Sequence, residues 1–154
     1  MKTQKQTHSA VDQLMHRWRT GHIELHEFFD EYRKWAYQVA QRGFPHFGEA
    51  ADRLRQLRGK LIDHFRKEDE ISEELVALGG QPTPEIDANR RQISADHVHL
   101  LNRLDELIDQ LGALEPPFES WQEAVEQVER FCDALEQHEE QESDCINWLT
   151  PKKG

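Results

Sequence analysis

Six His and Glu residues interrupt the apolar positions of the sequence and could together bind metal ions. They are His22, His64, Glu68, His97, His138 and Glu142. A His and a Glu four residues apart, as in the pairs at 64/68 and 138/142, lie on one helical face about one turn apart. A buried carboxylate loses its hydration, so it needs a charged partner or must take up a proton. Four imidazoles and two carboxylates suit a pair of iron ions, with zinc or manganese as alternatives.

The same residue types recur in the same order in the two halves of the chain. The segment HIELHEFFDEY from His22 aligns with HVHLLNRLDEL from His97 without a gap, and HFRKE from His64 aligns with HEEQE from His138. Such a repeat predicts two helical hairpins related by a pseudo-twofold axis. Counted from the turns, the heights of the His residues differ by about 6 to 8 Å, roughly one helical turn. One layer of the core can therefore contain all six residues.

Three Gly/Pro-rich segments, 41–49, 78–85 and 111–120, divide the chain into four helices. Between them, apolar residues recur at alternating steps of three and four, which is the helical period. Thr83 before Pro84 predicts a helix start, and so does the capping-box spacing of Ser120 and Glu123. The sequence predicts an all-α fold, an antiparallel up-down four-helix bundle with an internal repeat. The bundle is expected over 11–149, with a flexible N-terminal tail at 1–10 and a C-terminal tail at 150–154.

The remaining His residues and most acidic residues are expected to lie outside this layer. His26, one turn after His22, falls at the edge of the apolar face and could be a fifth His ligand or a donor to a ligand. Surface positions are expected for His8, His16, His46 and His99. The segment EEQESD, 139–144, is expected to be a solvated acidic face apart from Glu142. Asp96 could orient an imidazole or face water.

The net charge and the hydropathy of the sequence argue against several kinds of partner and against a membrane-spanning protein. The formal net charge of the 154 residues is -11, which argues against nucleic acid or an anionic membrane as a partner. The N-terminal segment lacks the apolar core of a signal peptide, and no run approaches the roughly 18 apolar residues of a membrane span. A cytoplasmic protein is therefore expected. Cys132 and Cys145 would lie about 20 Å apart on one helix, too far for a disulfide within the chain.

The order His, HxxxE, His and HxxxE on four helices resembles the hemerythrin-like, or HHE cation-binding, domain family. The resemblance extends from His22 to Glu142. It implies a carboxylate-bridged non-haem di-iron centre, that is, two iron ions in a four-helix bundle. The terminal ligands implied are His22, His64, His97 and His138, and the implied bridges are Glu68 and Glu142.

The sequence departs from the oxygen-carrying members of that family. Those hemerythrins have five His, with HxxxH on the third helix and HxxxxD on the fourth. Here Leu101 stands four residues after His97, while Glu142 stands four after His138 and Ser143 five after it. These differences argue against reversible oxygen carriage. The arrangement is more similar to the di-iron domain of iron-sulfur cluster repair proteins and to stand-alone bacterial HHE proteins linked to oxygen, peroxide or nitric oxide.

Three hypotheses follow from these residues. The first is a di-iron protein that binds, senses or reduces a small oxidant, namely oxygen, peroxide or nitric oxide, with a redox protein as its partner. The second is a non-catalytic iron-handling module that delivers iron to an acceptor protein. The third is a metal-free bundle whose polar layer is only structural. The residues fit both an enzyme and a binding protein, and turnover of peroxide or nitric oxide would separate the first hypothesis from the second.

Overall fold

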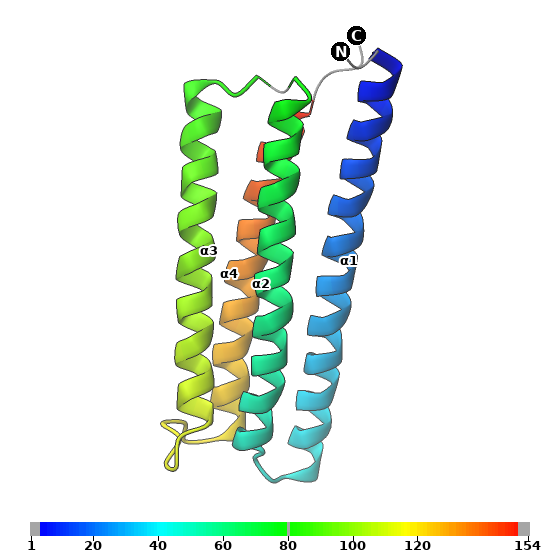
Figure 1. Cartoon of the computed structure of the whole chain (residues 1–154). Coiled ribbons are helices and arrows are strands. Elements are labelled where there is room, and N and C mark those ends of the chain that lie inside the picture. Colours follow the sequence, from blue (N-terminus) through cyan, green and yellow to red (C-terminus); the bar gives the residue numbers. More distant parts are fainter. Residues whose placement is uncertain (1–3, 80, 151–154) are drawn as a thin grey trace.

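The computed structural model describes residues 4–79 and 81–150 and consists of four long antiparallel helices (Figure 1). The helices are α1 (Gln4–Arg42), α2 (Phe47–Ala77), α3 (Pro84–Leu111) and α4 (Trp121–Leu149). No strand occurs among the described residues. The predicted all-α, up-down four-helix bundle is confirmed.

The starts of α3 and α4 follow the capping residues in the sequence. The Thr83 hydroxyl accepts a hydrogen bond from the backbone N–H of Ile86, and Pro84 follows in the first turn. The Ser120 hydroxyl accepts one from the backbone N–H of Glu123. These bonds satisfy N–H groups that have no partner within the helix. Both predicted helix starts are confirmed.

The first helix begins earlier than the predicted limit of the bundle. α1 is helical from Gln4, whereas the sequence led us to expect a tail over residues 1–10. Buried Val11 and Leu14 continue the three-and-four spacing upstream of Trp18, and no Gly or Pro interrupts it. Residues 1–3 and 151–154 of the two predicted tails lie outside the described residues.

The bundle core contains two apolar clusters separated by polar side chains. One cluster includes Leu61, Leu104 and Phe131, and the other, nearer the start of α1 and the end of α4, includes Trp18 and Ile146. Between them lies a set of side chains that we call the polar layer: His22, His64, Glu68, His97, His138, Glu139 and Glu142. The apolar clusters hold the four helices together on both sides of the layer, so its side chains face one another.

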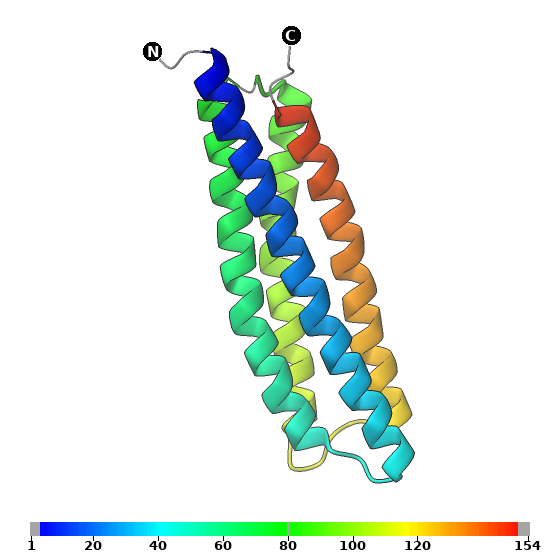
Figure 2. The ribbon, with the colours of Figure 1, turned by 90° about the vertical axis from the view of Figure 1, so that its right-hand side faces the viewer.

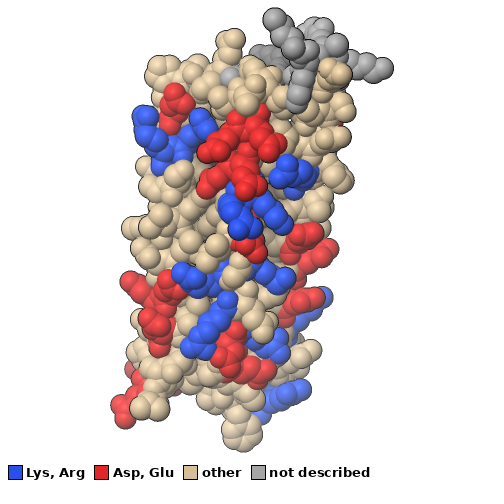
Figure 3. Space-filling view, viewed as in Figure 1, with Lys and Arg blue, Asp and Glu red and all other residues tan. Residues whose placement is uncertain are grey.

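Helices that are consecutive in the sequence are neighbours in the bundle. α1 packs between α2 and α4, and α3 lies diagonally across from it, as two perpendicular views show (Figures 1 and 2). On the face viewed in Figure 3, acidic and basic side chains are interspersed, so the negative charge is not confined to one patch there. None of the described helices contains a stretch long and apolar enough to cross a bilayer.

Candidate metal centre

All four helices contribute to the polar layer. α1 supplies His22, α3 supplies His97, and α2 supplies the pair at 64 and 68. α4 supplies His138, Glu139 and Glu142. The structure therefore brings the six residues identified from the sequence into one layer and adds Glu139 to them. Their potential ligand atoms fall into two groups, within each of which all atoms lie within 4.8 Å of one another.

The first group consists of His22, His64, Glu68 and Glu139. The Nε2 atom of His22 lies 2.7 Å from Oε2 of Glu139 and 3.4 Å from Oε2 of Glu68. The Nε2 atom of His64 lies 2.7 Å from Oε1 of Glu68 and 3.2 Å from Oε1 of Glu139. Two imidazoles and two carboxylates thus converge, each imidazole with Nε2 inward.

The second group consists of His97, His138 and Glu142, all of them buried. Oε2 of Glu142 lies 3.0 Å from Nε2 of His138 and 3.5 Å from Nε2 of His97. The same oxygen therefore faces both imidazoles. This group contains one carboxylate, whereas the first group contains two.

Two aspartates lie behind the imidazoles of the second group. Asp69 Oδ1 is 3.6 Å from Nδ1 of His97, and Asp96 Oδ2 is 3.7 Å from Nδ1 of His138. These are ion-pair distances, longer than direct hydrogen bonds. Asp96, which is fixed by a 2.9 Å hydrogen bond from the side chain of Gln92, faces His138 and not the His97 that follows it in sequence. Carboxylates behind an imidazole orient the ring and raise its basicity toward a metal.

The polar layer contains nearly all the unpaired buried polar atoms of the described chain. Among described residues, every buried side-chain nitrogen or oxygen without a hydrogen-bond partner belongs to this layer, except Nε of Arg53. Both oxygens of Glu68 and the Nε2 atoms of His22, His97 and His138 are among them. Buried polar groups are normally paired, because an unpaired one loses its hydration without replacement. Imidazole nitrogens and carboxylate oxygens are metal ligands, so the layer fits bound cations.

The three carboxylates of the layer influence one another strongly. Burial raises the pKa of Glu68 well above its usual value, and the nearby Glu142 and Glu139 carboxylates raise it further. Burial also opposes ionisation of Glu139, but the adjacent imidazoles of His22 and His64 outweigh burial and lower the pKa of that carboxyl. Like charges this close repel one another, and cations between them would remove the repulsion.

The same carboxylates favour the charged form of two imidazoles. Burial lowers the pKa of His22, yet Glu139 and Glu68 outweigh burial and raise that pKa to about 9. The pKa of His97 is likewise raised to about 9, because Asp69 and Glu142 outweigh burial. A metal ligand must be a neutral imidazole, so cation binding here would release protons.

Glu139 corrects the sequence interpretation of segment 139–144. That segment was expected to face water apart from Glu142, but the exposure of Glu139 is 6 %. The face that α4 buries is wider than one line of residues, because adjacent residues are buried in pairs every seven positions: Phe131–Cys132, His138–Glu139 and Cys145–Ile146. This seven-residue recurrence was the signal in the sequence that could have identified Glu139.

The other His side chains that the structure describes lie outside both groups of ligand atoms. His26 is exposed and joins neither group. His16 and His99 are exposed, as predicted. His46 is partly exposed at the start of α2, with Nδ1 3.4 Å from a carboxylate oxygen of Glu49. The side chain of His8 lies outside the described part of the chain.

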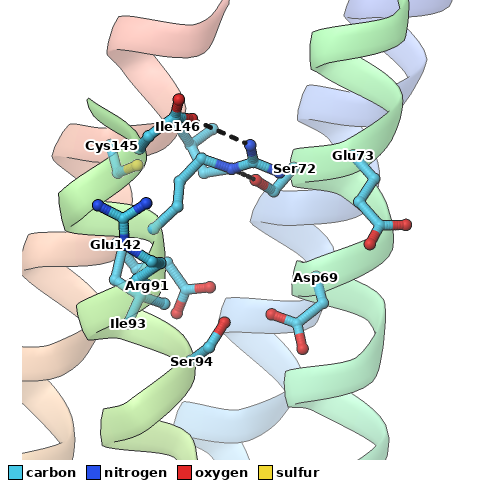
Figure 4. Close-up of a pocket in the computed structure, with 11 residues that line it drawn as sticks. Asp69, Ser72, Glu73, Arg91, Ile93, Ser94, Glu142, Cys145 and Ile146 are labelled. Atoms are coloured by element: carbon cyan, nitrogen blue, oxygen red, sulfur yellow. Dashed lines mark hydrogen bonds and ion pairs between the residues drawn. The ribbon is translucent and has the colours of Figure 1, made fainter. Parts of the chain in front are cut away.

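Two solvent-open pockets reach the layer from different sides. One, of about 420 Å³, lies between α2, α3 and α4 and reaches Glu142 (Figure 4). Its walls include Ser94 and Asp69, and the Arg90 side chain donates a 3.0 Å hydrogen bond to the Ser72 hydroxyl there. The other, of about 390 Å³, lies between α1 and α4 and is lined by His22, His26, Glu136, Glu139, Glu140 and Ser143. Each group of ligand atoms therefore has its own route to solvent.

Comparison with known proteins places the chain in a family. The family model described as the hemerythrin HHE cation binding domain matches residues 13–144, a span that includes every residue of the polar layer. No curated protein and no solved structure gives a significant match. The matched span covers most of the chain, and the family model describes a cation-binding domain. The chain therefore belongs to the hemerythrin HHE cation-binding domain family and is a metal-binding four-helix bundle.

Proposed function

We propose that the protein is a non-haem di-iron protein that binds, senses or reduces a small oxidant: oxygen, peroxide or nitric oxide. The observation that carries the proposal is the polar layer itself, in which four imidazoles and the carboxylates between them form two adjacent groups of ligand atoms. Nearly all the unpaired buried polar atoms of the described chain lie there.

Each half of the chain would hold one ion. His22 and His64 would be terminal ligands of the first, and His97 and His138 of the second. The carboxyl groups of Glu68 and Glu142 are close enough to shift each other's pKa, which supports their place between the two positions as bridging ligands. Iron bound there would supply two neighbouring redox-active positions for a small oxidant.

The side chains around the layer would orient the ligands and limit access of water. The ring of Phe65 stacks on His97, with centroids 4.0 Å apart, and the ring of Trp18 lies 4.3 Å from that of His22. Asp69 would hold His97 from behind in the orientation that directs Nε2 inward. The solvent-open pocket of about 420 Å³ that is lined in part by Glu142 would be the path of a diatomic molecule or peroxide to the layer.

A second candidate is a non-catalytic module that delivers iron to an acceptor protein. The pocket between α1 and α4 favours it, because the pocket is open to solvent and lined by carboxylates and imidazoles. His22 lies in its wall with 20 % of its side chain exposed. A cation could leave the first group along this route without unfolding of the bundle.

Two assays on the iron-loaded protein separate these candidates. In the first, peroxide or nitric oxide is added with a chemical reductant, and its consumption is followed over many equivalents. In the second, a metal-free acceptor protein is added, and iron transfer is measured after the two proteins are separated. Consumption beyond one equivalent per iron pair, or a change in the iron absorption bands on stoichiometric binding, without loss of iron, is the result expected for the oxidant function. Transfer of iron with neither consumption nor binding of the oxidant would overturn it in favour of iron delivery.

A further inference from the structure

We infer that Glu139 is a seventh protein ligand of the centre, so that the two metal positions are chemically unequal. Glu139 would bind the ion held by His22 and His64. The inference rests on the proposed metal pair and deepens it, since neither the repeated His and HxxxE pattern nor the family match assigns a role to this residue. It concerns a side chain that the sequence led us to expect in water.

The contacts of Glu139 direct both of its oxygens into the first group. Oε2 lies 2.7 Å from Nε2 of His22, and Oε1 lies 3.2 Å from Nε2 of His64. In the described part of the chain, no Lys or Arg pairs with this carboxylate. The side chain is 8 % exposed, so water replaces little of the missing charge. An ionised carboxylate in such a place requires a cationic partner.

Binding of a metal by the two imidazoles would leave Glu139 without its present partners. A neutral imidazole that binds a cation through Nε2 has no hydrogen on that atom. Among the described residues, Glu139 pairs only with the Nε2 atoms of His22 and His64, which are the atoms turned toward the other ligands. Once those atoms bind a metal, neither can donate to the carboxylate. In the part of the chain that the structure describes, no Lys or Arg is paired with Glu139, so the ion itself would be its cationic partner.

The internal repeat shows that this carboxylate belongs to one half of the chain only. In the alignment of HFRKE with HEEQE, Glu139 takes the place of Phe65. Phe65 lies flat on His97, with ring centroids 4.0 Å apart and an interplanar angle of 9°. Glu139 contacts His22, the counterpart of His97 in the repeat. Equivalent places beside equivalent imidazoles are therefore filled by a phenyl ring at one metal position and a carboxylate at the other.

This difference determines which position keeps room for an external ligand. The first position would have two imidazoles and two carboxylates from the chain, Glu68 and Glu139. The second would have two imidazoles and the carboxylate of Glu142, which lines the pocket seen in Figure 4. If Glu68 and Glu142 bridge the two ions, the first position still has one carboxylate more than the second, that of Glu139. A small ligand would therefore bind at the second position, and the first would be the more tightly held.

Titration of the metal-free protein with Co²⁺ tests this inference without any catalytic assay. Cobalt is followed by its visible absorption, which depends on coordination number, and affinities are obtained by competition with a chelator. The variants are Glu139→Gln, which keeps the shape but removes the charge, and Glu126→Gln, a matched control at an exposed position of the same helix. Thermal unfolding of each metal-free variant checks its fold.

We expect the wild type to bind two cobalt ions, the one at the first position more tightly, and Glu126→Gln to bind both ions with the wild-type affinities. In Glu139→Gln, one ion should bind as before, while the affinity for the other falls about 100-fold or more, since even loss of a residue behind a ligand costs 10- to 100-fold. If Glu139→Gln fails to fold, Glu139→Leu is used instead, because it replaces the buried charge by an apolar group. The same loss of affinity for one of the two cobalt ions is expected in Glu139→Leu.

The outcomes separate this inference from the proposed function. Two cobalt ions bound to Glu139→Gln with wild-type affinities and an unchanged spectrum would overturn the role of Glu139 and leave the metal pair intact. A wild-type protein that binds no pair of ions would overturn the metal pair itself, and the role of Glu139 with it.

Discussion

Phe65 lies against the imidazole of His97 with an interplanar angle of only 9°. The stack, together with Asp69 behind Nδ1, leaves the Nε2 atom of His97 directed at Glu142. The phenyl ring is also buried, with 3 % exposure, in the larger of the two apolar clusters. One side chain therefore supports both the packing of α2 on α3 and the orientation of a candidate metal ligand.

Replacement of Phe65 by Ala should weaken both functions. Truncation of a buried Phe leaves a cavity and costs about 3–5 kcal/mol of unfolding free energy. Denaturant unfolding of the metal-free protein would measure this loss, and Co²⁺ titration would show weaker binding at one of the two positions. An Ala replacement of exposed Phe44 should change neither quantity. Unchanged cobalt affinities in Phe65→Ala would contradict the orienting role of the stack.

Asp69 should affect metal affinity without contributing to the ligand set. Asp69→Asn removes the charge 3.6 Å from Nδ1 of His97 and should lower the affinity of one metal position about 10- to 100-fold. Asp63→Asn, at an exposed position of the same helix, is the matched control. If both variants bind cobalt like the wild type, Asp69 is only a surface charge.

The carboxylates of the layer should be unfavourable for stability when no metal is bound. In a Glu68→Leu/Glu142→Leu variant the metal-free protein should be as stable as the wild type or more stable by about 1–4 kcal/mol, because apolar side chains replace buried charges. Addition of Co²⁺ should raise the melting temperature of the wild type by more than that of the variant, which keeps only the imidazoles and Glu139. A variant that is much less stable than the metal-free wild type would instead assign the carboxylates a structural role.

Much of this organisation could be predicted from the sequence. The helix breaks at Gly/Pro segments, the caps at Thr83 and Ser120, and the apolar spacing determine four helices with little competition from other structures. The six repeated His and Glu residues were identifiable because each replaces an apolar residue on a predicted buried face. A polar residue at a buried position requires a physical reason, such as the binding of cations that we propose for this layer.

The residues that were missed depend on how neighbouring helices meet. Glu139 is buried because α4 buries adjacent pairs of residues where it packs beside α1, whereas a single three-and-four stripe passes through His138 and leaves Glu139 outside. Asp69 faces His97 across the contact between α2 and α3. Which imidazole Asp69 faces depends on the relative heights of α2 and α3. The sequence determines these heights only to within about one helical turn. The early start of α1 was missed because polar residues precede Val11.

The thiol of Cys132 provides a pH-dependent test of core packing away from the metal centre. Burial raises the pKa of this thiol to about 12. Between its usual pKa and 12, the unfolded chain loses the proton while the folded chain retains it, so unfolding becomes more favourable as the pH rises. At one pH unit above the usual pKa, the wild type should have lost about 1.4 kcal/mol that a Cys132→Ala variant does not lose.

Denaturant unfolding of both proteins at pH 7 and pH 10 gives this difference directly. Subtraction of the variant removes the contribution of all other groups that titrate in this range. Equal losses of stability in the two proteins would show that the Cys132 thiol ionises as readily in the folded chain as in the unfolded one.

Whether the polar layer holds a pair of irons can be measured from the iron content and the near-ultraviolet to visible absorption of protein purified from iron-supplemented cells. The comparison is with a His64→Ala/His138→Ala variant and with a His16→Ala/His99→Ala control at exposed positions. The account predicts about two irons per chain and ligand-to-iron charge-transfer bands in the wild type and the control, with both lost in the first variant. A colourless, iron-free wild type, or a first variant that retains iron and bands, would contradict it.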